Sequence, residues 1–186
     1  MGQYWRVIAK DRDGKVTVYD RSVDGEYTAA KLMEHSWWGN PFCRALCATI
    51  VDNPRRIAWV GDYADYDLDD MDIGFKYEDV WGDDAPDVGL ASTEFSMDDV
   101  KYLVDDTERQ YVDLAKYKAA SEESGGWVIH PLPILTCVGN GHGGGDYHPG
   151  DGLSGEFVGA WCFDRVYLSN TLPDGYEEIS PVFREN

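Results

Sequence analysis

A glycine-rich stretch at residues 139–152, GNGHGGGDYHPGDG, carries the residue types best suited to bind a metal ion or a phosphate. His142, Asp146 and His148 offer imidazole and carboxylate ligands for zinc or another divalent transition metal. Half of the stretch is glycine, which lets backbone N–H groups approach a phosphate closely. His130, before the apolar run that leads into the stretch, could act as an acid, a base or a further ligand. One hypothesis is therefore a metal- or phosphate-binding enzyme.

Backbone chemistry offers a simpler explanation of the same stretch. Glycine adopts the positive φ angles of tight turns, so the stretch also fits a long hairpin loop with surface histidines. No Gly-Lys-Ser/Thr sequence follows it, which weakens a phosphate-binding interpretation. His35, beside Ser36, has no identifiable orienting acid, and we expect it and His130 to be hydrogen-bonded structural side chains.

An acidic segment from Asp62 to Asp106 dominates the charge distribution. It holds 16 Asp and Glu residues against two lysines, a net charge of −14 in a chain whose net charge is −19. Duplex DNA carries one negative charge per ~1.7 Å of axis, so the segment matches roughly 24 Å of duplex. Such a surface predicts binding to a basic nucleic-acid-binding protein by charge mimicry. The alternative is a solvated acidic loop that serves only solubility.

Carboxylates would supply the charge of such a surface, and aromatic side chains would anchor it. We expect the partner-binding residues to be Asp65, Asp67, Asp69, Asp70, Asp72, Asp83 and Asp84, with Tyr66 and Trp81 as anchors. Asp65, Asp67 and Asp69 also open a calcium-loop pattern. However, Asp70 stands where that loop needs glycine, and Lys76 stands where it needs glutamate, which argues against a calcium site.

The four cysteines show no spacing typical of a disulfide framework. Cys43 and Cys47 lie four residues apart, on one face of a predicted helix. We expect them to pack as small apolar groups, because a metal site would need two more ligands.

Turn and cap signals predict the elements of the first third of the chain. Runs at 4–10 and 15–21 flank an Asp-Gly turn and predict a hairpin. Asn40 before Pro41 predicts a helix N-cap, and the helix should end near Pro54. Its apolar face is Cys43, Leu46, Cys47 and Ile50. We also expect a helix within 28–35 and a core strand at 56–61.

The rest of the chain gives weaker signals. Ser96 and the acidic residues after it predict a helix through 104. Extended segments are expected at 110–114, 127–130, 134–138 and 157–168, with Pro131 and Pro133 at an edge or bulge, and a break at 121–126. These elements predict an α+β fold: a single domain, 1–186, with a mainly antiparallel sheet, two or three helices and the acidic insertion at 62–106.

Composition limits the classes of function. Apolar residues make up 43 % of the chain and aromatic residues 13 %, which is too much for a disordered polyanion. No apolar run is long enough to cross a bilayer, and residues 1–10 lack a secretion signal, which predicts a cytoplasmic protein. The negative charge disfavours direct binding to nucleic acid or membrane and favours a basic protein partner.

Several motifs together resemble a known family. They are MGQY at the start, KLMEHSWWGN (31–40), RIAWVGDYAD (56–65), RQYVDLAKY (109–117), HPLPILT (130–136) and GNGHGGGDY (139–147). This combination, which spans most of the chain, is similar to a family of uncharacterised proteins encoded by gut bacteria and their phages. The resemblance implies a bacterial or phage setting and transfers no site residue.

The leading hypothesis is a non-enzymatic interaction protein in a bacterial host cell, without a cofactor. Its acidic surface would occlude a basic nucleic-acid-binding partner, as a phage-type anti-defence inhibitor would. The alternatives are an enzyme that binds a divalent transition metal or phosphate at 139–152, and an acidic housekeeping protein without a specific partner.

Overall fold

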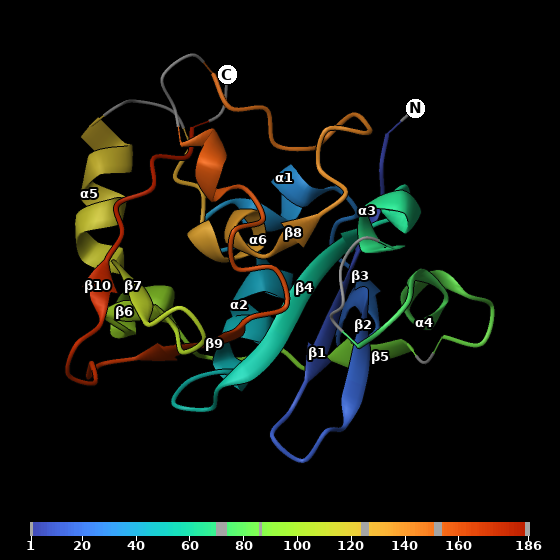
Figure 1. Ribbon diagram of the computed structural model, residues 1–186, viewed down its shortest axis with the longest axis horizontal. Coiled ribbons are helices and arrows are strands. Elements are labelled where there is room, and N and C mark those ends of the chain that lie inside the picture. The colour runs from blue at the N-terminus through green and yellow to red at the C-terminus, as the bar shows by residue number, and fades with distance from the viewer. Residues whose placement is uncertain (1, 70–73, 86, 124–126, 151–153, 185–186) are drawn as a thin grey trace.

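The computed structural model describes residues 2–69, 74–85, 87–123, 127–150 and 154–184 of the chain (Figure 1). The strands are β1 (Trp5–Lys10), β2 (Val16–Val23), β3 (Glu26–Tyr27), β4 (Arg55–Gly61), β5 (Asp87–Leu90), β6 (Tyr102–Asp105), β7 (Gln110–Asp113), β8 (Cys137–Val138), β9 (Arg165–Ser169) and β10 (Glu177–Glu178). The helices are α1 (Leu32–Ser36), α2 (Pro41–Thr49), α3 (Asp65–Asp69), α4 (Tyr77–Trp81), α5 (Leu114–Glu123) and α6 (Pro131–Leu135), with 3-10 turns at Met97–Asp99 and Gly155–Phe157.

The strands form one sheet in the order β10-β7-β6-β9-β4-β1-β2-β3, with β5 beside β2 and β8 beside β4. Among the described strands, parallel pairing is limited to the short contacts of β5 with β2, β8 with β4 and β10 with β7. The longest pairing joins β1 to β4 antiparallel, from Trp5 opposite Gly61 to Lys10 opposite Arg56. The predicted α+β fold with a mainly antiparallel sheet is confirmed, although the described residues form six α-helices instead of two or three.

Alternate residues of β1 and β4 enter two separate cores, because successive strand side chains face opposite sides of a sheet. Trp5, Val7 and Trp59 enter the major core, together with residues of α1, α2, α5 and α6. Ile8 and Val60 enter the minor core, which α3 and α4 cover on the other side. Both faces of this strand pair are therefore removed from water, which explains its nearly continuous apolar sequence.

Helix α2 begins where its cap signal predicts. The side-chain oxygen of Asn40 accepts the N–H of Cys43 at 3.0 Å, and its amide nitrogen donates to the carbonyl of Glu34 at 2.8 Å. Pro41 occupies the first turn, where its missing N–H costs nothing. The predicted apolar face is confirmed, since Cys43, Leu46, Cys47 and Ile50 are all buried. The helix ends at Thr49, a few residues before the predicted end near Pro54.

Other local predictions are also confirmed. The hairpin forms between β1 and β2, with Lys10 opposite Val16. The core strand at 56–61 is β4, and the extended segment at 110–114 is β7. The predicted break at 121–126 begins late, because α5 continues to Glu123, and residues 124–126 lie outside the described residues.

Two helix predictions are wrong in extent. At 28–35 the helix forms from Leu32 onward, because the Glu34 carboxylate accepts the N–H groups of Ala30 and Lys31 and caps the helix there. At 96–104 only a 3-10 turn follows Ser96. The residues beyond it form β6, because pairing with β7 and β9 buries Leu103 and Val104.

Three strand predictions, at 127–130, 134–138 and 157–168, are also wrong in whole or in part. Residues 131–135 form α6, in which His130 is the N-cap and the prolines lie in the first turn, where backbone N–H groups lack helical partners anyway. Strand structure after it is limited to β8, and residue 129 makes only an isolated bridge to Trp37. At 157–168 the chain is irregular until β9, because Phe163 adopts a left-handed φ of 59° that interrupts an extended run.

The Asn40 cap predicts a measurable loss of stability. In an Asn40→Ala variant the N–H of Cys43 and the carbonyl of Glu34 lose their buried partner. We expect the free energy of unfolding in urea to fall by about 2 kcal/mol. Asn53→Ala, which removes an exposed hydrogen bond to the carbonyl of Thr49, is the matched control and should cost less than half as much. Equal losses would contradict the cap assignment.

Candidate functional site

The first part of the acidic segment is a folded lobe on the sheet. Ala64, Leu68, Phe75 and Val80 belong to the minor core and are at most 8 % exposed. We call residues 62–87 the acidic lobe. It contains 11 acidic residues and one basic residue, a net charge of −10. Residues 70–73 and 86 and the side chain of residue 69 lie outside the described part of the lobe.

Arg6 of β1 fastens α4 to the sheet. Its guanidinium donates to the carbonyl of Val80 at 2.9 Å and pairs with Asp87 at 3.0 Å. The same group lies 4.7 Å from the centroid of the Trp81 ring. The indole N–H of Trp81 donates to the carbonyl of Val60 at 3.3 Å. Trp81 therefore helps to hold the lobe in place. No pattern in the sequence indicates this role for Arg6, which lies more than 70 residues before α4.

Most carboxylates of the described lobe face solvent without a cation beside them. Arg6 forms an ion pair with Asp87, and Nε2 of His142 lies 2.9 Å from a carboxylate oxygen of Asp67. Tyr66, between the acids of α3, is 79 % exposed. Among the described residues of the lobe, the exposed acids outside these two contacts are Asp65, Glu78, Asp79, Asp83 and Asp84.

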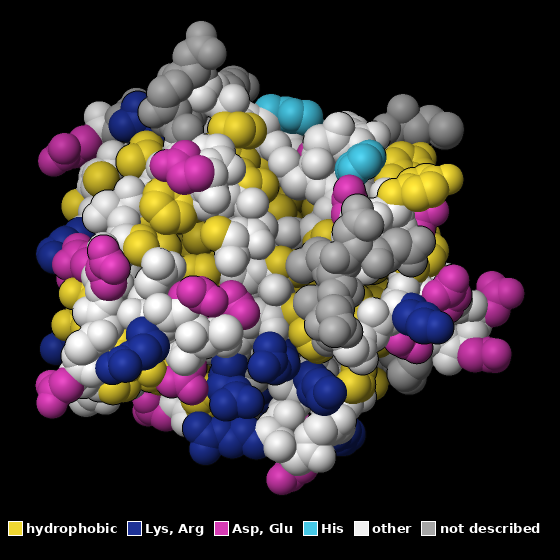
Figure 2. Space-filling view, viewed as in Figure 1, with side chains coloured by type: hydrophobic (Ala, Val, Ile, Leu, Met, Phe, Trp, Pro, Cys, Tyr) yellow, Lys and Arg dark blue, Asp and Glu magenta, His cyan; other side chains and the backbone are white. Residues whose placement is uncertain are grey.

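Most basic side chains on the face in view lie away from the lobe. Figure 2 shows Lys and Arg side chains gathered at the lower edge, whereas Asp and Glu side chains lie at the right-hand edge, around α4 and beside a basic side chain, and also along the left side. That lower edge lies by the turn between β1 and β2 and the start of β4 (Figure 1). Lys10, Arg56 and Arg165 are direct cross-strand neighbours at this end of the sheet. The basic side chains therefore leave the lobe largely unneutralised.

The acidic segment 62–106 is not one surface, which corrects the sequence-based expectation. After the lobe, β5 pairs with β2, whereas β6 lies between β7 and β9 at the other side of the sheet. Asp98 pairs with Lys118, Asp105 is buried, and Asp106 accepts the hydroxyl hydrogen of Tyr176. The described candidate residues Asp65, Asp67, Asp83, Asp84, Tyr66 and Trp81 all stay within the lobe, whereas Asp70, Asp72 and the side chain of Asp69 lie outside the described residues.

The glycine-rich stretch folds around its own carboxylate. Asp146 is 3 % exposed. One of its oxygens accepts the N–H groups of Gly141 and Gly143 at 2.9 and 3.0 Å, and the other accepts the indole N–H of Trp5 at 3.1 Å. The position that a bound anion would take is thus filled by the chain itself. Gly141 has a φ of +93°, as expected if glycine serves the turn.

The structure does not bring His142, Asp146 and His148 together as metal ligands. His142 and His148 are exposed, and His142 faces Asp67 of α3, while Asp146 is buried. His35 is buried between the carbonyl of Ala29 and the indole N–H of Trp59. Burial lowers the pKa of His35 to about 4, which fits a neutral structural side chain.

His130 instead meets the two cysteines of α2. The potential ligand atoms of Cys43, Cys47 and His130 lie within 4.8 Å of one another. In the described part of the chain, this is the one group of three or more His, Cys, Asp or Glu side chains that could hold a metal ion. All three are fully buried. Burial by itself raises the pKa of a thiol, but for Cys43 the hydrogen bond with Cys47 and the nearby His130 outweigh it and lower the pKa to about 6. The sequence missed this cluster because His130 is 83 residues beyond Cys47.

Asp105, which is buried, and Asp164, which is half-buried, form a second group that the sequence did not reveal. One oxygen of Asp105 accepts the N–H groups of Thr107 and Glu108 at 2.7 and 3.3 Å. Burial, and then the negative charge of Asp164, raise the pKa of Asp105 to about 7. The pKa of Asp164 is raised as well, first by burial. The two carboxyl groups thus favour a shared proton at neutral pH.

Comparison of the chain with protein-family models, with curated proteins and with solved structures finds no match. The resemblance to the family of gut bacteria and their phages therefore stays a prediction from motifs. In the described residues, no helix has the length and apolar character needed to span a bilayer.

The hydrogen bonds of Asp146 predict a structural role for this residue. Asp146→Asn places an NH2 group where one of the carboxylate oxygens accepts N–H donors. We expect a loss of about 2 kcal/mol in the free energy of unfolding, because buried donors lose their acceptor. Asp13→Asn, at an exposed turn, is the control and should change stability by less than about 0.5 kcal/mol. An unchanged Asp146→Asn variant would show that the loop does not depend on this carboxylate.

The raised pKa of Asp105 predicts a stability that falls with pH. A carboxyl whose pKa is higher in the folded than in the unfolded state favours folding while it is protonated, and this contribution is lost as the pH rises through about 7. In an Asp105→Asn variant the free energy of unfolding should therefore change less between about pH 5 and 8. At pH 8 it should be about 1 to 2 kcal/mol higher than in the wild type, after allowance for screening. Urea unfolding at several pH values measures this. Parallel curves for the two proteins would contradict the shared proton.

Proposed function

We propose that this protein is a non-enzymatic interaction protein whose acidic lobe binds a basic nucleic-acid-binding protein and excludes nucleic acid from it. The observation that carries the proposal is that α3 and α4 each have one buried apolar face and one exposed acidic face. Leu68 and Val80 are buried in the minor core, while Asp65, Glu78 and Asp79 on the same helices face solvent.

Anchoring of this kind favours recognition over mere solubility. A loose acidic loop would have to be ordered on binding, at a cost in conformational entropy for each residue. The described carboxylates of the lobe are already placed by the minor core and by Arg6. Unpaired charge of one sign speeds association with a surface of the opposite sign. Tyr66, with 79 % exposure, supplies an aromatic side chain that can be buried on binding.

The setting we propose is the cytoplasm of a bacterial host cell, with a role as a phage-type anti-defence inhibitor. This part of the proposal is supported by the family resemblance and by the charge of the lobe. The enzyme alternative at residues 139–152 gains no support, because the oxygens of Asp146 are already engaged by three N–H donors.

A charge-neutralised lobe tests the proposal. The lobe variant carries Asp65→Asn, Glu78→Gln, Asp83→Asn and Asp84→Asn. The control variant removes the same charge elsewhere, by Glu26→Gln, Glu122→Gln, Glu123→Gln and Glu177→Gln at exposed positions. Each protein is immobilised and exposed to an extract of the cells that produce it, and bound proteins are eluted with a salt gradient.

We expect wild type and control to retain the same basic protein, which elutes with salt and is also released by added duplex DNA. The lobe variant should retain it at least about tenfold less, because each removed charge weakens attraction to the partner. Equal retention by both variants, or retention unaffected by duplex DNA, would refute charge mimicry. Capture of no protein at all would favour the acidic housekeeping alternative.

A further inference from the structure

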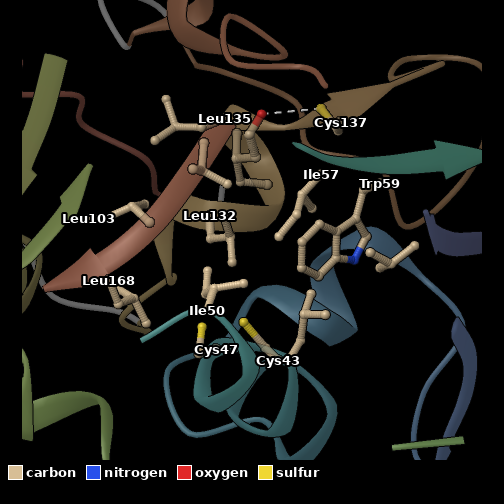
Figure 3. Close-up of a cluster of buried hydrophobic side chains, with 14 of the residues drawn as sticks. Cys43, Cys47, Ile50, Ile57, Trp59, Leu103, Leu132, Leu135, Cys137 and Leu168 are labelled. Atoms are coloured by element: carbon tan, nitrogen blue, oxygen red, sulfur yellow. Dashed lines mark hydrogen bonds between the residues drawn. The ribbon is translucent and has the colours of Figure 1, made fainter. Parts of the chain in front are cut away.

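Two thiols and an imidazole come together between α2 and α6. Cys43 and Cys47 are four residues apart on a helix, a spacing that places both sulfur atoms on one face. Figure 3 shows both sulfur atoms on the side of α2 that faces Leu132 of α6. With His130, at the N-cap of α6, the potential ligand atoms lie within 4.8 Å of one another.

The position of His130 is fixed by its surroundings. Its backbone N–H donates to the carbonyl of Ser36, and its ring lies 5.1 Å from that of Trp38, centroid to centroid. The ring nitrogen Nδ1 accepts the N–H of Leu132 at 3.3 Å. The other nitrogen, Nε2, is buried and makes no hydrogen bond of standard geometry, although the Cys43 thiol is close enough to interact with the His130 ring. A buried polar atom without a partner is costly, so this nitrogen points to a missing ligand.

The donor set and the burial select the kind of ligand. Thiolate and imidazole are the donors that zinc-class cations bind in proteins. A divalent cation with two thiolates and a neutral imidazole has no net charge, which suits a fully apolar environment, whereas a monovalent cation would leave one negative charge buried. Binding releases the two thiol protons to solvent and moves the ring proton from Nε2 to Nδ1, which breaks the long contact with the N–H of Leu132.

We propose that Cys43, Cys47 and His130 form a binding site for a thiophilic divalent cation of the zinc class, with a water molecule as the fourth ligand that such cations usually take. The three side chains are fully buried, so the site serves the fold and not a reaction with a substrate. The cation joins α2 to the start of α6, two segments far apart in the sequence, and stabilises the folded chain because the ligands converge only there. This inference is independent of the function proposed for the acidic lobe.

Cobalt substitution tests the site directly. The full chain is unfolded under reducing conditions and refolded with one equivalent of Co²⁺, since the ligands are closed off in the folded protein. We expect thiolate-to-cobalt charge-transfer bands in the near ultraviolet, stoichiometric with protein, and their loss on addition of Zn²⁺. Thermal unfolding with excess Zn²⁺ should show a Tm about 5 to 10 °C higher than with a chelator.

Variants separate this site from the other cysteines. Cys43→Ala with Cys47→Ala should abolish the charge-transfer bands and the zinc-dependent rise in Tm. Cys137→Ala with Cys162→Ala, which alters the two cysteines outside the cluster, should retain both. If the wild type folds but shows no thiolate-to-cobalt bands, the proposal is overturned without recourse to a variant. Bands that persist in the variant without Cys43 and Cys47 would overturn it as well. Binding of Cu⁺ in place of Co²⁺ and Zn²⁺ would also overturn it.

Discussion

The antiparallel pairing of β1 with β4 is the constraint on which the rest of the structure depends. Six consecutive residue pairs join the strands, and both of their faces are buried. Trp5 and Trp59 on one side give α1, α2 and α6 a surface to pack against, and Ile8 and Val60 on the other side do the same for α3 and α4. The cysteine–histidine cluster and the acidic lobe therefore lie on opposite faces of the same strand pair.

Several contacts turn a highly charged segment into an ordered surface. Arg6 reaches from β1 to α4, and the hydroxyl of Tyr77 donates to the carbonyl of Asp62. His142 reaches from the glycine-rich stretch to Asp67 of α3, so that stretch supports the lobe instead of forming a separate site. The described acids around these contacts repel one another. The burial of Phe75 and Val80 stabilises the lobe against that repulsion.

The sequence predicted the features that depend on local chemistry. The Asp-Gly turn, the Asn40 cap and the apolar face of α2 are each encoded within about ten residues, and the structure confirms them. Predictions failed where distant pairing decides the outcome. Residues 102–105 form a strand because pairing with the adjacent β7 and with the distant β9 buries Leu103 and Val104. Pro131 and Pro133 were expected at an edge or bulge of the sheet but lie in the first turn of α6, where a proline costs no hydrogen bond.

The candidate site was predictable in composition but not in arrangement. The run of acids at 62–106 contains the lobe, whereas the division of this acidic segment depends on where β5 and β6 enter the sheet. Periodicity placed Cys43 and Cys47 on one face of α2, but no sequence rule brings His130 to them across 83 residues. The roles of Arg6 and Trp81 likewise follow from contacts between distant segments.

Amide hydrogen exchange of the free protein tests the central claim that the acidic lobe is held as a folded surface. The N–H groups of Leu68 and Gly82 donate to the carbonyls of Ala64 and Glu78, within the lobe. They should exchange at least about 100-fold more slowly than amides of an unstructured peptide, because exchange requires the lobe to detach from the minor core. Exchange at the rate of an unstructured peptide would show that the carboxylates are carried on a loose segment, and would contradict the account.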